Sequence, residues 1–484
     1  MKEYPFSNQL LQIRDSLFDF LDQKIYSKVS RSVSPRKSFI RWFALFFCCM
    51  STIGGYYCQN ATGPLQTPIM EIFGISTTKF NLLYTAYSVP NIIMPLLGGF
   101  IIDKSGVRIG LTLFALLIIV GQALITLGAK YLMFNVMLFG TAIMGVGLDA
   151  LCAAKSTMVV KWFQAHEVAF AMGLTLTISR LGSSISSYLA PLIYTNTGSL
   201  AAPLAVGIGL GIFSLIMIGF LCFFDYYAEV RESEFKTGAV EAKEVFQISD
   251  MKNFKLIFYL IMLNCMLAYS VIQGFLFNAS DLMNKRFGFN PTLSGKYLSI
   301  VFILATIFSP VFGKVADVIG KRVTLLLGSF FLMGLANLQV VLMTDTEPGN
   351  PNTSIVFSLI GTGMAYSAYA AIIWPCVSMV VEDKANGTAY GFALAMQNLM
   401  LSIVPLVIGY IHDGTMDVSH GYYWTEVFLV ILAIIGTVTT VWIKSEDGKN
   451  GSVLEAAPVR ENNENYKQMS NENSVELSVV DRGV

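Results

Sequence analysis

The feature that most constrains this chain is a ten-residue segment that occurs twice. Residues 99–108 read GFIIDKSGVR and residues 313–322 read GKVADVIGKR. Both copies place glycine, aspartate, glycine and arginine at relative positions 0, +4, +7 and +9. Each copy joins two long apolar runs, and a short turn that carries these charges cannot lie in hydrocarbon. The repeat therefore predicts two equivalent turns at a membrane surface, one in each half of the chain.

The composition is that of a membrane protein. Of the 484 residues, 54% are hydrophobic and 13% are charged, and the mean hydropathy is +0.60. A soluble domain has about a quarter charged residues, and apolar runs of about 20 residues are long enough to cross a bilayer as helices. We therefore predict an all-α membrane protein with twelve transmembrane helices in two pseudo-symmetric six-helix bundles. The predicted spans are 39–58, 79–102, 109–128, 131–158, 169–193, 201–224, 255–279, 293–316, 323–343, 354–381, 389–411 and 422–443.

Polar segments divide the chain and indicate its orientation. The charged segment 225–254 predicts a cytosolic linker between an N-terminal bundle, 39–224, and a C-terminal bundle, 255–443. Basic residues gather in the linker, in the repeated turns and at both ends of the chain. By the positive-inside rule both termini are then cytosolic. We expect a cytosolic N-terminal segment over 1–38 and a disordered cytosolic tail over 444–484, which is rich in Asn, Glu and Ser.

No pattern in the sequence is typical of nucleic-acid binding, metal binding or catalysis. The formal net charge is zero, so nothing favours a nucleic-acid partner. The seven cysteines and three histidines are scattered, which indicates no metal site and no cofactor. There is no constellation of a nucleophile with a base. We therefore expect that the protein is not an enzyme and that it contacts the lipid bilayer.

Sequons of the form N-x-S/T test the predicted orientation. Asn60 and Asn352 fall on the side predicted to be lumenal, and we predict that both are glycosylated. Asn278 falls on the same side but close to the end of its helix.

Two charged residues lie deep inside predicted spans, Asp149 in the fourth and Arg180 in the fifth. At about 1.5 Å per residue they lie roughly 14 and 16 Å from the cytosolic surface. An acid and a base at one level either form an internal salt bridge or receive the amine and carboxylate of a zwitterion. A guanidinium suits bidentate carboxylate capture, which favours the second interpretation. Lys155 lies nearer the cytosolic end of its span and is expected to snorkel to the interface.

Uncharged polar and aromatic side chains add candidates for the same site, because a pocket for a polar solute needs some of them. Aromatic residues in such spans more often pack between helices than contact a substrate. The predicted substrate-binding residues are Asp149, Arg180, Tyr57, Gln59, Gln273, Tyr366, Trp374, Gln397 and Asn398. The predicted gating residues in the two turns are Gly99, Asp103, Gly106, Arg108, Gly313, Asp317, Gly320 and Arg322.

The repeated turns resemble the signature loop of the major facilitator superfamily, and the resemblance covers the chain from about residue 39 to residue 443. Further stretches are similar to one branch, the lysosomal dipeptide transporters. They are TKFNLLY at 78–84, SRLGS at 179–183 and GTAYGF at 387–392. The resemblance implies a carrier that alternates access and exports dipeptides, either passively or under the influence of protons. It also implies a partner, either a glycosylated accessory membrane protein or a second copy.

The same resemblance suggests roles for the charged residues. Arg180 matches the family's arginine, and Asp149 stands where the family has a glutamate, so together they would hold the two termini of a dipeptide. The two turns would stabilise the lumen-open state. A lysosomal membrane is implied, with the plasma membrane or another endomembrane as the alternative. Two competing functions are an organic-anion or sugar carrier and a membrane receptor or scaffold that does not transport.

Overall fold

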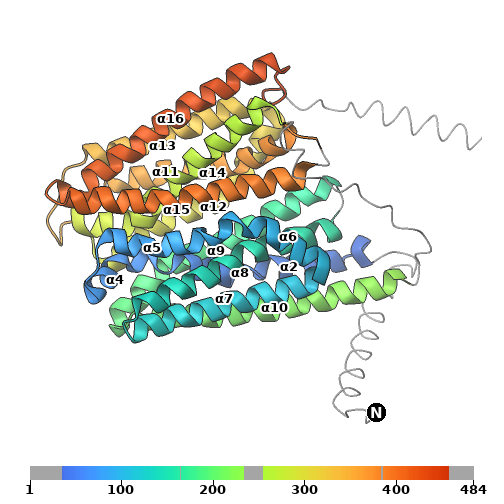
Figure 1. Cartoon of the computed structure of the whole chain (residues 1–484), viewed down its shortest axis with the longest axis horizontal. Coiled ribbons are helices and arrows are strands. Elements are labelled where there is room, and N and C mark those ends of the chain that lie inside the picture. Colours follow the sequence, from blue (N-terminus) through green and yellow to red (C-terminus); the bar gives the residue numbers. More distant parts are fainter. Residues whose placement is uncertain (1–34, 164, 234–253, 383–384, 457–484) are drawn as a thin grey trace, which may run out of the picture.

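The computed structural model is a bundle of long helices that run side by side (Figure 1). The structure describes residues 35–163, 165–233, 254–382 and 385–456. These residues form α-helices and short 3-10 turns, with no β-strand among them. Nine of the described helices are long and apolar enough to cross a membrane. The prediction of an all-α membrane protein is confirmed.

The helices of the N-terminal half are α2 (Ile40–Met50), α3 (Ile53–Asn60), α4 (Gln66–Phe73), α5 (Thr77–Ser88), α6 (Met94–Ser105), α7 (Val107–Lys130), α8 (Phe134–Trp162), α9 (Ala165–Thr197) and α10 (Ala201–Ser233). The helices of the C-terminal half are α11 (Leu256–Arg286), α12 (Pro291–Ile319), α13 (Arg322–Leu342), α14 (Ile355–Met379), α15 (Asn386–Gly414) and α16 (Tyr422–Lys449). Short 3-10 turns are η1 (Pro35–Lys37), η2 (Gly63–Leu65), η3 (Pro90–Ile92) and η6 (Ser419–Gly421).

Each of the twelve predicted spans corresponds to one long helix or to a pair of shorter helices. Helices α2 and α3 form the first span, with a break at Ser51 and Thr52. Helices α5 and α6 form the second, interrupted at Pro90, whose ring removes a backbone donor. Helix α9 forms the fifth, and its serines and Arg180 make it more polar than the nine apolar helices. The observed helices therefore agree with the predicted fold.

Buried apolar side chains form two separate cores. One core is built from residues between Ile40 and Ala228, and the other from residues between Ile257 and Leu454. Each core thus lies within one half of the sequence, because each group of helices buries its apolar faces against its own members. Helices α13 and α16 lie on one side of the molecule, and α7 and α10 on the opposite side (Figure 1). We call the two groups of helices the N-terminal and C-terminal bundles.

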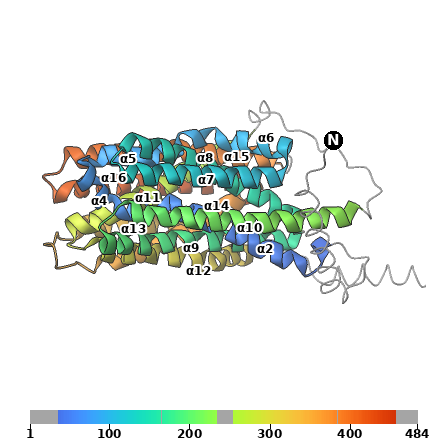
Figure 2. The same cartoon turned by 90° about the horizontal axis from the view of Figure 1, so that it is seen from below.

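The sixth span continues beyond its predicted end. Helix α10 runs to Ser233, whereas the sequence predicts a linker over 225–254, and Figure 2 shows α10 extending past its neighbours. The residue that marked the predicted boundary, Asp225, is fully buried and accepts hydrogen bonds from three basic side chains. These partners compensate its charge, so the helix does not end there. Residues 234–253 lie outside the described residues.

The predicted disordered tail over 444–484 also begins later than expected. Helix α16 continues to Lys449, and residues 450–456, which we call the C-terminal strap, fold back against the start of α13. Leu454 in the strap is fully buried. The tail is rich in polar residues, and the strap is anchored by the buried Leu454 and by specific hydrogen bonds. Residues 457–484 lie outside the described residues.

The C-terminal strap caps a helix. The backbone amides of Leu454 and Glu455 donate to the Asp447 carboxylate at 3.1 and 3.2 Å. The Lys321 amide donates to the Glu455 carbonyl at 3.1 Å. The Glu455 carboxylate in turn accepts from the backbone N–H of Thr324 at 2.8 Å. That N–H belongs to the first turn of α13, where backbone donors have no partner within the helix.

Replacing the capping carboxylate should destabilise the protein. We expect Glu455→Ala to cost about 1 kcal/mol, since it leaves a first-turn N–H of α13 without its partner. The measurement is the melting temperature of the purified protein in detergent. Glu446→Ala is the matched control, because Glu446 lies on α16 outside the strap and its carboxylate pairs with the exposed Lys449. Equal melting temperatures for the two variants would contradict the capping role.

Candidate substrate site between the two bundles

We name the two ends of the molecule by the orientation that the charge distribution predicts. The cytosolic end holds the turns at 105–107 and 319–321, and the lumenal end holds the turns at 74–76 and 287–290. The helices run between these two ends. Positions along a helix therefore give the depth of a side chain in the membrane.

Helices α5 and α15, which belong to different bundles, are joined by a series of hydrogen bonds. At the lumenal end the Asp413 carboxylate accepts from the backbone N–H of Thr78 at 2.9 Å. Deeper in the molecule, the side chains of Asn81 and Thr85 donate to backbone carbonyls of α15 at 2.7 and 2.8 Å. The next contact along α15 is made by Asn398, near the middle of the molecule, and it reaches α8 instead of α5.

Asp149 lies on α8 at the point where this series ends. Its carboxylate accepts a hydrogen bond from the Tyr87 hydroxyl at 2.9 Å, within the N-terminal bundle. It also accepts one from the Asn398 amide at 3.2 Å, across to the C-terminal bundle. The side chain is half-buried. The acid therefore faces the interface between the bundles and not the lipid.

Arg180 lies on α9, and its contacts come from the C-terminal bundle. The guanidinium donates to the Ala305 carbonyl at 3.1 Å and to the Ser309 hydroxyl, both on α12. It also lies over the ring of Tyr366 on α14, 4.7 Å from the centroid, which is a cation–π arrangement. Like the acid, this base is directed at the opposite bundle.

Asp149 and Arg180 do not pair with each other. Among the described residues no ion pair joins them, so the interpretation as an internal salt bridge is not supported. Each charge instead finds partners on the opposite bundle. Among contacts between described residues, no polar contact joins the two bundles closer to the cytosolic end than those of Asn398 and Ser309. Among the described residues, the contacts of Asp149 and Arg180 are therefore the polar contacts between the bundles that lie nearest the cytosolic end.

Of the other predicted substrate-binding residues, Tyr366 and Asn398 lie in this site, because they contact Arg180 and Asp149 directly. Trp374 packs in the C-terminal bundle, with ring centroids 6.3 Å from Tyr269 and 6.1 Å from Tyr390. Three predicted residues are half-buried and make no polar contact with Asp149 or Arg180 among the described residues. They are Gln59, Gln273 and Gln397.

The prediction for Tyr57 is wrong. This side chain is fully buried, and its hydroxyl donates to the Pro203 carbonyl of α10 at 3.1 Å. It therefore closes a contact within the N-terminal bundle. In the sequence, a tyrosine near the end of a span looks the same whether its ring packs within one bundle or faces the other bundle. Only the rotation of α3 about its axis decides which way the ring points.

Sequence reasoning missed two residues of the site, Tyr87 and Ser309. Tyr87 lies on α5 and Ser309 on α12, which correspond to the second and eighth spans. The predicted substrate-binding residues lie in or beside the first, fourth, fifth, seventh, tenth and eleventh spans, and none lies in the second or eighth. Both residues could have been predicted from the polar side chains of the second and eighth spans, because both spans lie at the interface between the bundles.

Two carboxylates of the C-terminal bundle close the lumenal end. Asp413 accepts three hydrogen bonds from the first turn of α5, including the Thr78 hydroxyl at 2.6 Å. Asp281 is fully buried and accepts from the hydroxyls of Thr67 and of a tyrosine on α16. We call Thr67, Thr78, Asp281 and Asp413 the lumenal seal. The bundles approach closely there, since a side chain at Gly409 would come within 2.5 Å of the Thr78 backbone.

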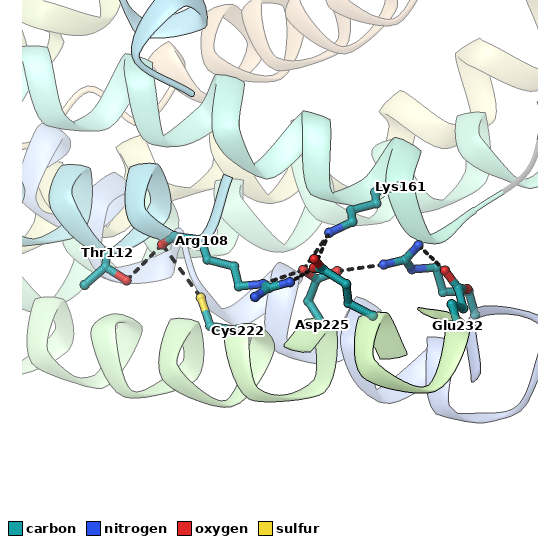
Figure 3. Close-up of polar contacts among 8 residues, drawn as sticks. Arg108, Thr112, Lys161, Cys222, Asp225 and Glu232 are labelled. Carbon is teal, nitrogen blue, oxygen red and sulfur yellow. Dashed lines mark hydrogen bonds and ion pairs between the residues drawn. The ribbon is translucent and has the colours of Figure 1, made fainter. Parts of the chain in front are cut away.

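The repeated turns contact helices of their own bundles. Gly106 and Gly320 have φ of +87° and +67°, a region that favours glycine, which explains the glycine at position +7 of the repeat. In the first turn Arg108 donates to the Asp225 carboxylate at 2.8 Å, and Lys161 donates to the same carboxylate at 2.7 Å (Figure 3). This turn therefore ties together the cytosolic ends of three helices of the N-terminal bundle.

The second turn is held differently. Arg322 is mostly buried and pairs at 3.3 Å with Asp317, which is itself exposed. A side chain at Gly99 or Gly313 would meet no atom within 4 Å, so no helix packs closely against either glycine in this structure. The Asp103 side chain lies outside the described residues.

The sequons differ in exposure. The half-buried Asn60 side chain donates to the Ser183 hydroxyl at 2.9 Å, a hydrogen bond that a glycan on this nitrogen would replace, and its glycosylation stays a prediction. Asn278 is buried. Asn352 lies half-exposed in the loop 343–354 and stays a predicted site.

The expectation that Lys155 snorkels to the interface is also wrong. The side chain is 2% exposed and lies inside the N-terminal bundle. Its ammonium finds two hydroxyl partners there, at 3.4 Å from Thr52 and 3.3 Å from Ser179. A lysine that finds polar partners within the bundle does not need to reach the membrane surface.

Twelve spans in two bundles, with charged side chains at their interface, define the class of secondary membrane transporters. The sequence profile of the Major Facilitator Superfamily matches residues 43–299 and 261–475. The chain therefore belongs to the major facilitator superfamily and is a multi-pass membrane transporter, not an enzyme.

Similar proteins carry more specific names. The chain is 32% identical over 431 residues to the human lysosomal dipeptide transporter MFSD1, which covers 86% of this chain and 89% of the relative. It is 31% identical over 420 residues to the protein of that name from Danio rerio, covering 84% and 87%. A shorter match is the hexuronate transporter of Escherichia coli, 26% identical over 152 residues, or 31% of this chain and 34% of the relative.

Weakening the lumenal seal should expose the lumenal end. Asp413→Asn replaces a carboxylate that accepts three hydrogen bonds from α5 by a neutral amide. We expect a cysteine reporter at the buried position Gln66 to react about tenfold faster with a lumenal, membrane-impermeant maleimide, because charge-assisted hydrogen bonds are lost. Asp417→Asn, in the exposed segment that follows α15, is the control. An unchanged labelling rate in Asp413→Asn would rule out a sealing role for this carboxylate.

Proposed function

We propose that this transporter moves dipeptides or similar small zwitterions across the lysosomal membrane by alternating access. One observation carries the proposal: an acid and a base of the N-terminal bundle, Asp149 and Arg180, both contact the C-terminal bundle and do not pair with each other. A dipeptide offers an ammonium and a carboxylate a few ångströms apart. Such a solute complements the two charges.

The groups that contact Asp149 and Arg180 are neutral, so the charged termini of a substrate can displace them. Arg180 is held by one carbonyl, one hydroxyl and one aromatic face, all neutral groups. A substrate carboxylate would form stronger, bidentate hydrogen bonds with the guanidinium. Asp149 accepts from a tyrosine hydroxyl and an amide, which are also neutral, so a substrate ammonium would bind it more strongly. Exchange of neutral partners for charged ones favours binding.

The same contacts support a mechanism of alternating access. The polar contacts between the bundles run from the lumenal seal down to Asn398 and Ser309. This distribution is that of a carrier closed toward the lumen. In major facilitator proteins the substrate lies near the midplane between the two halves, which rock around it. A substrate that takes the place of Asn398 on Asp149 would therefore alter the contact that holds the halves together.

The proposals of a lysosomal membrane and of a partner protein are based on similar proteins. Those that cover most of this chain are named as lysosomal transporters, which supports a lysosomal membrane. The resemblance extends the proposal to a partner in the membrane, either a glycosylated accessory protein or a second copy of this chain. Passive transport and proton-coupled transport are both consistent with the contacts of the site.

A second candidate function is transport of a sugar acid or another organic anion. The observation that favours it is the local similarity to a hexuronate transporter, together with an arginine suited to carboxylates. That match spans 152 residues, whereas the dipeptide transporters match 431. A counterflow panel of dipeptides, sugar acids and neutral sugars separates the two candidates. Ligand binding without counterflow of any solute would instead indicate a receptor.

Removing the guanidinium should abolish dipeptide transport while the protein still folds. We expect Arg180→Ala to reduce uptake of dialanine into proteoliposomes at least about a hundredfold, since the substrate carboxylate loses its charged partner. Arg180→Lys should recover part of the activity, because an ammonium keeps the charge but not the bidentate geometry. Uptake is measured with labelled peptide, and folding by melting temperature in detergent.

Lys296→Ala is the control for this experiment, because Lys296 is an exposed cation on α12, the helix that Arg180 contacts. It should transport at the rate of the unmodified protein. Asp149→Asn should lose uptake as Arg180→Ala does, since the amide cannot compensate the substrate ammonium. Normal dialanine uptake by Arg180→Ala would remove the arginine from the mechanism.

A further inference from the structure

Lys155 is a charge inside the membrane that the proposed binding of a zwitterion does not use. It lies on α8, six residues after Asp149, and is 2% exposed. Its nitrogen contacts Thr52 at the break between α2 and α3, and Ser179 on α9. Among the described residues no carboxylate pairs with it. An ionisable residue buried in a membrane helix is costly to keep and marks a functional site by default.

The hydroxyls around Lys155 present acceptors to it. The Ser179 hydroxyl donates to the Thr175 carbonyl at 2.7 Å, so its proton points away from the lysine. Thr52 and Ser179 share a hydrogen bond of 2.7 Å. Since the Ser179 proton is already used, Thr52 is the donor in that bond, and both oxygens keep lone pairs for the lysine nitrogen. Groups that only accept stabilise the charged ammonium.

The central layer of the N-terminal bundle therefore has an excess of positive charge. The ionisable side chains away from the helix ends there are Asp149, Lys155 and Arg180, one acid and two bases. The other charged side chains of this bundle that the structure describes between residues 39 and 224 lie near the helix ends: Arg41, Glu71, Lys79, Lys104, Arg108, Lys130, Lys161 and Glu167. A neutral dipeptide balances the charges of Asp149 and Arg180 but leaves that of Lys155 uncompensated.

Lys155 contacts the residue next to Arg180, the proposed carboxylate-binding side chain. Its hydroxyl partner Ser179 is the residue before Arg180 on α9. At its depth in the bundle, water and salt screen the ammonium much less than at a surface. Its field therefore reaches a substrate held by Arg180, although the buried side chain does not contact the substrate. A negative substrate side chain is attracted and a positive one is repelled.

We propose that Lys155 is a specificity-determining residue that makes this carrier favour dipeptides of net negative charge, those that contain Asp or Glu, over dipeptides that contain Lys or Arg. This inference rests on the proposed function, because it concerns the substrate of the same site. It assigns to Lys155 a role that differs from that of the substrate-contacting pair. Asp149 and Arg180 bind the two termini that every dipeptide has, and Lys155 selects by the charge of the side chains.

The test compares three peptides, Ala-Glu, Ala-Ala and Ala-Lys, in proteoliposome uptake. The unmodified protein should transport Ala-Glu with the highest kcat/KM and Ala-Lys with the lowest. Lys155→Met keeps the length of the side chain and removes its charge. It should lower the ratio of kcat/KM for Ala-Glu to that for Ala-Lys about tenfold, because the weakly screened charge acts on the substrate side chain without contacting it. Lys155→Arg should keep the ratio.

A purely structural role predicts a different result, because loss of packing would lower uptake of all three peptides together and leave the ratio unchanged. That outcome overturns the inference. If Lys155→Met does not fold, competition on the unmodified protein decides: equal inhibition of Ala-Ala uptake by Ala-Glu and Ala-Lys also overturns it. Absence of uptake of all three peptides by the unmodified protein overturns the proposed function itself, whereas uptake with an unmoved ratio overturns only the role of Lys155.

Discussion

The cost of charge in hydrocarbon is the constraint on which the rest of this structure depends. A charged side chain at the centre of a bilayer costs about 3 kcal/mol or more, so each one needs polar partners. Arg180 takes its partners from the opposite bundle, and Asp149 takes one from each bundle. Lys155 takes its partners from its own bundle. The first two charges therefore join the bundles, and the third lies within one of them.

In the mechanism that we propose, this arrangement would link substrate binding to the movement of the bundles. The neutral groups that satisfy Arg180 and Asp149 in this structure belong largely to the other bundle. A zwitterion that binds the same two side chains competes with those groups. Contact between the bundles and substrate binding would then use the same atoms. The lumenal seal, with Asp281 and Asp413, joins the bundles at the lumenal end of the interface. A small solute can thereby bias a large rearrangement.

The two halves repeat a sequence motif but complete it with different partners. Helices α10 and α16, the last of each bundle, both carry a buried aspartate near the cytosolic end, Asp225 and Asp447. Asp225 accepts from basic side chains, including Arg108 of the first turn. Asp447 accepts instead from backbone amides of the C-terminal strap, whose Glu455 caps α13 beside the second turn. The two bundles therefore place a buried aspartate at equivalent positions but pair it with different groups.

The sequence by itself determined the membrane class, the twelve spans, the repeated turns and the depth of Asp149 and Arg180, because hydropathy, turn chemistry and residue counting are local properties. Only the tertiary structure decided which way each side chain points about its helix axis. Tyr57 and Lys155 turned inward within one bundle, and Arg180 turned toward the other, since rotation and partner choice depend on contacts between residues far apart in the chain. Helix ends shifted for the same reason, as distant partners neutralised the charges that mark a boundary.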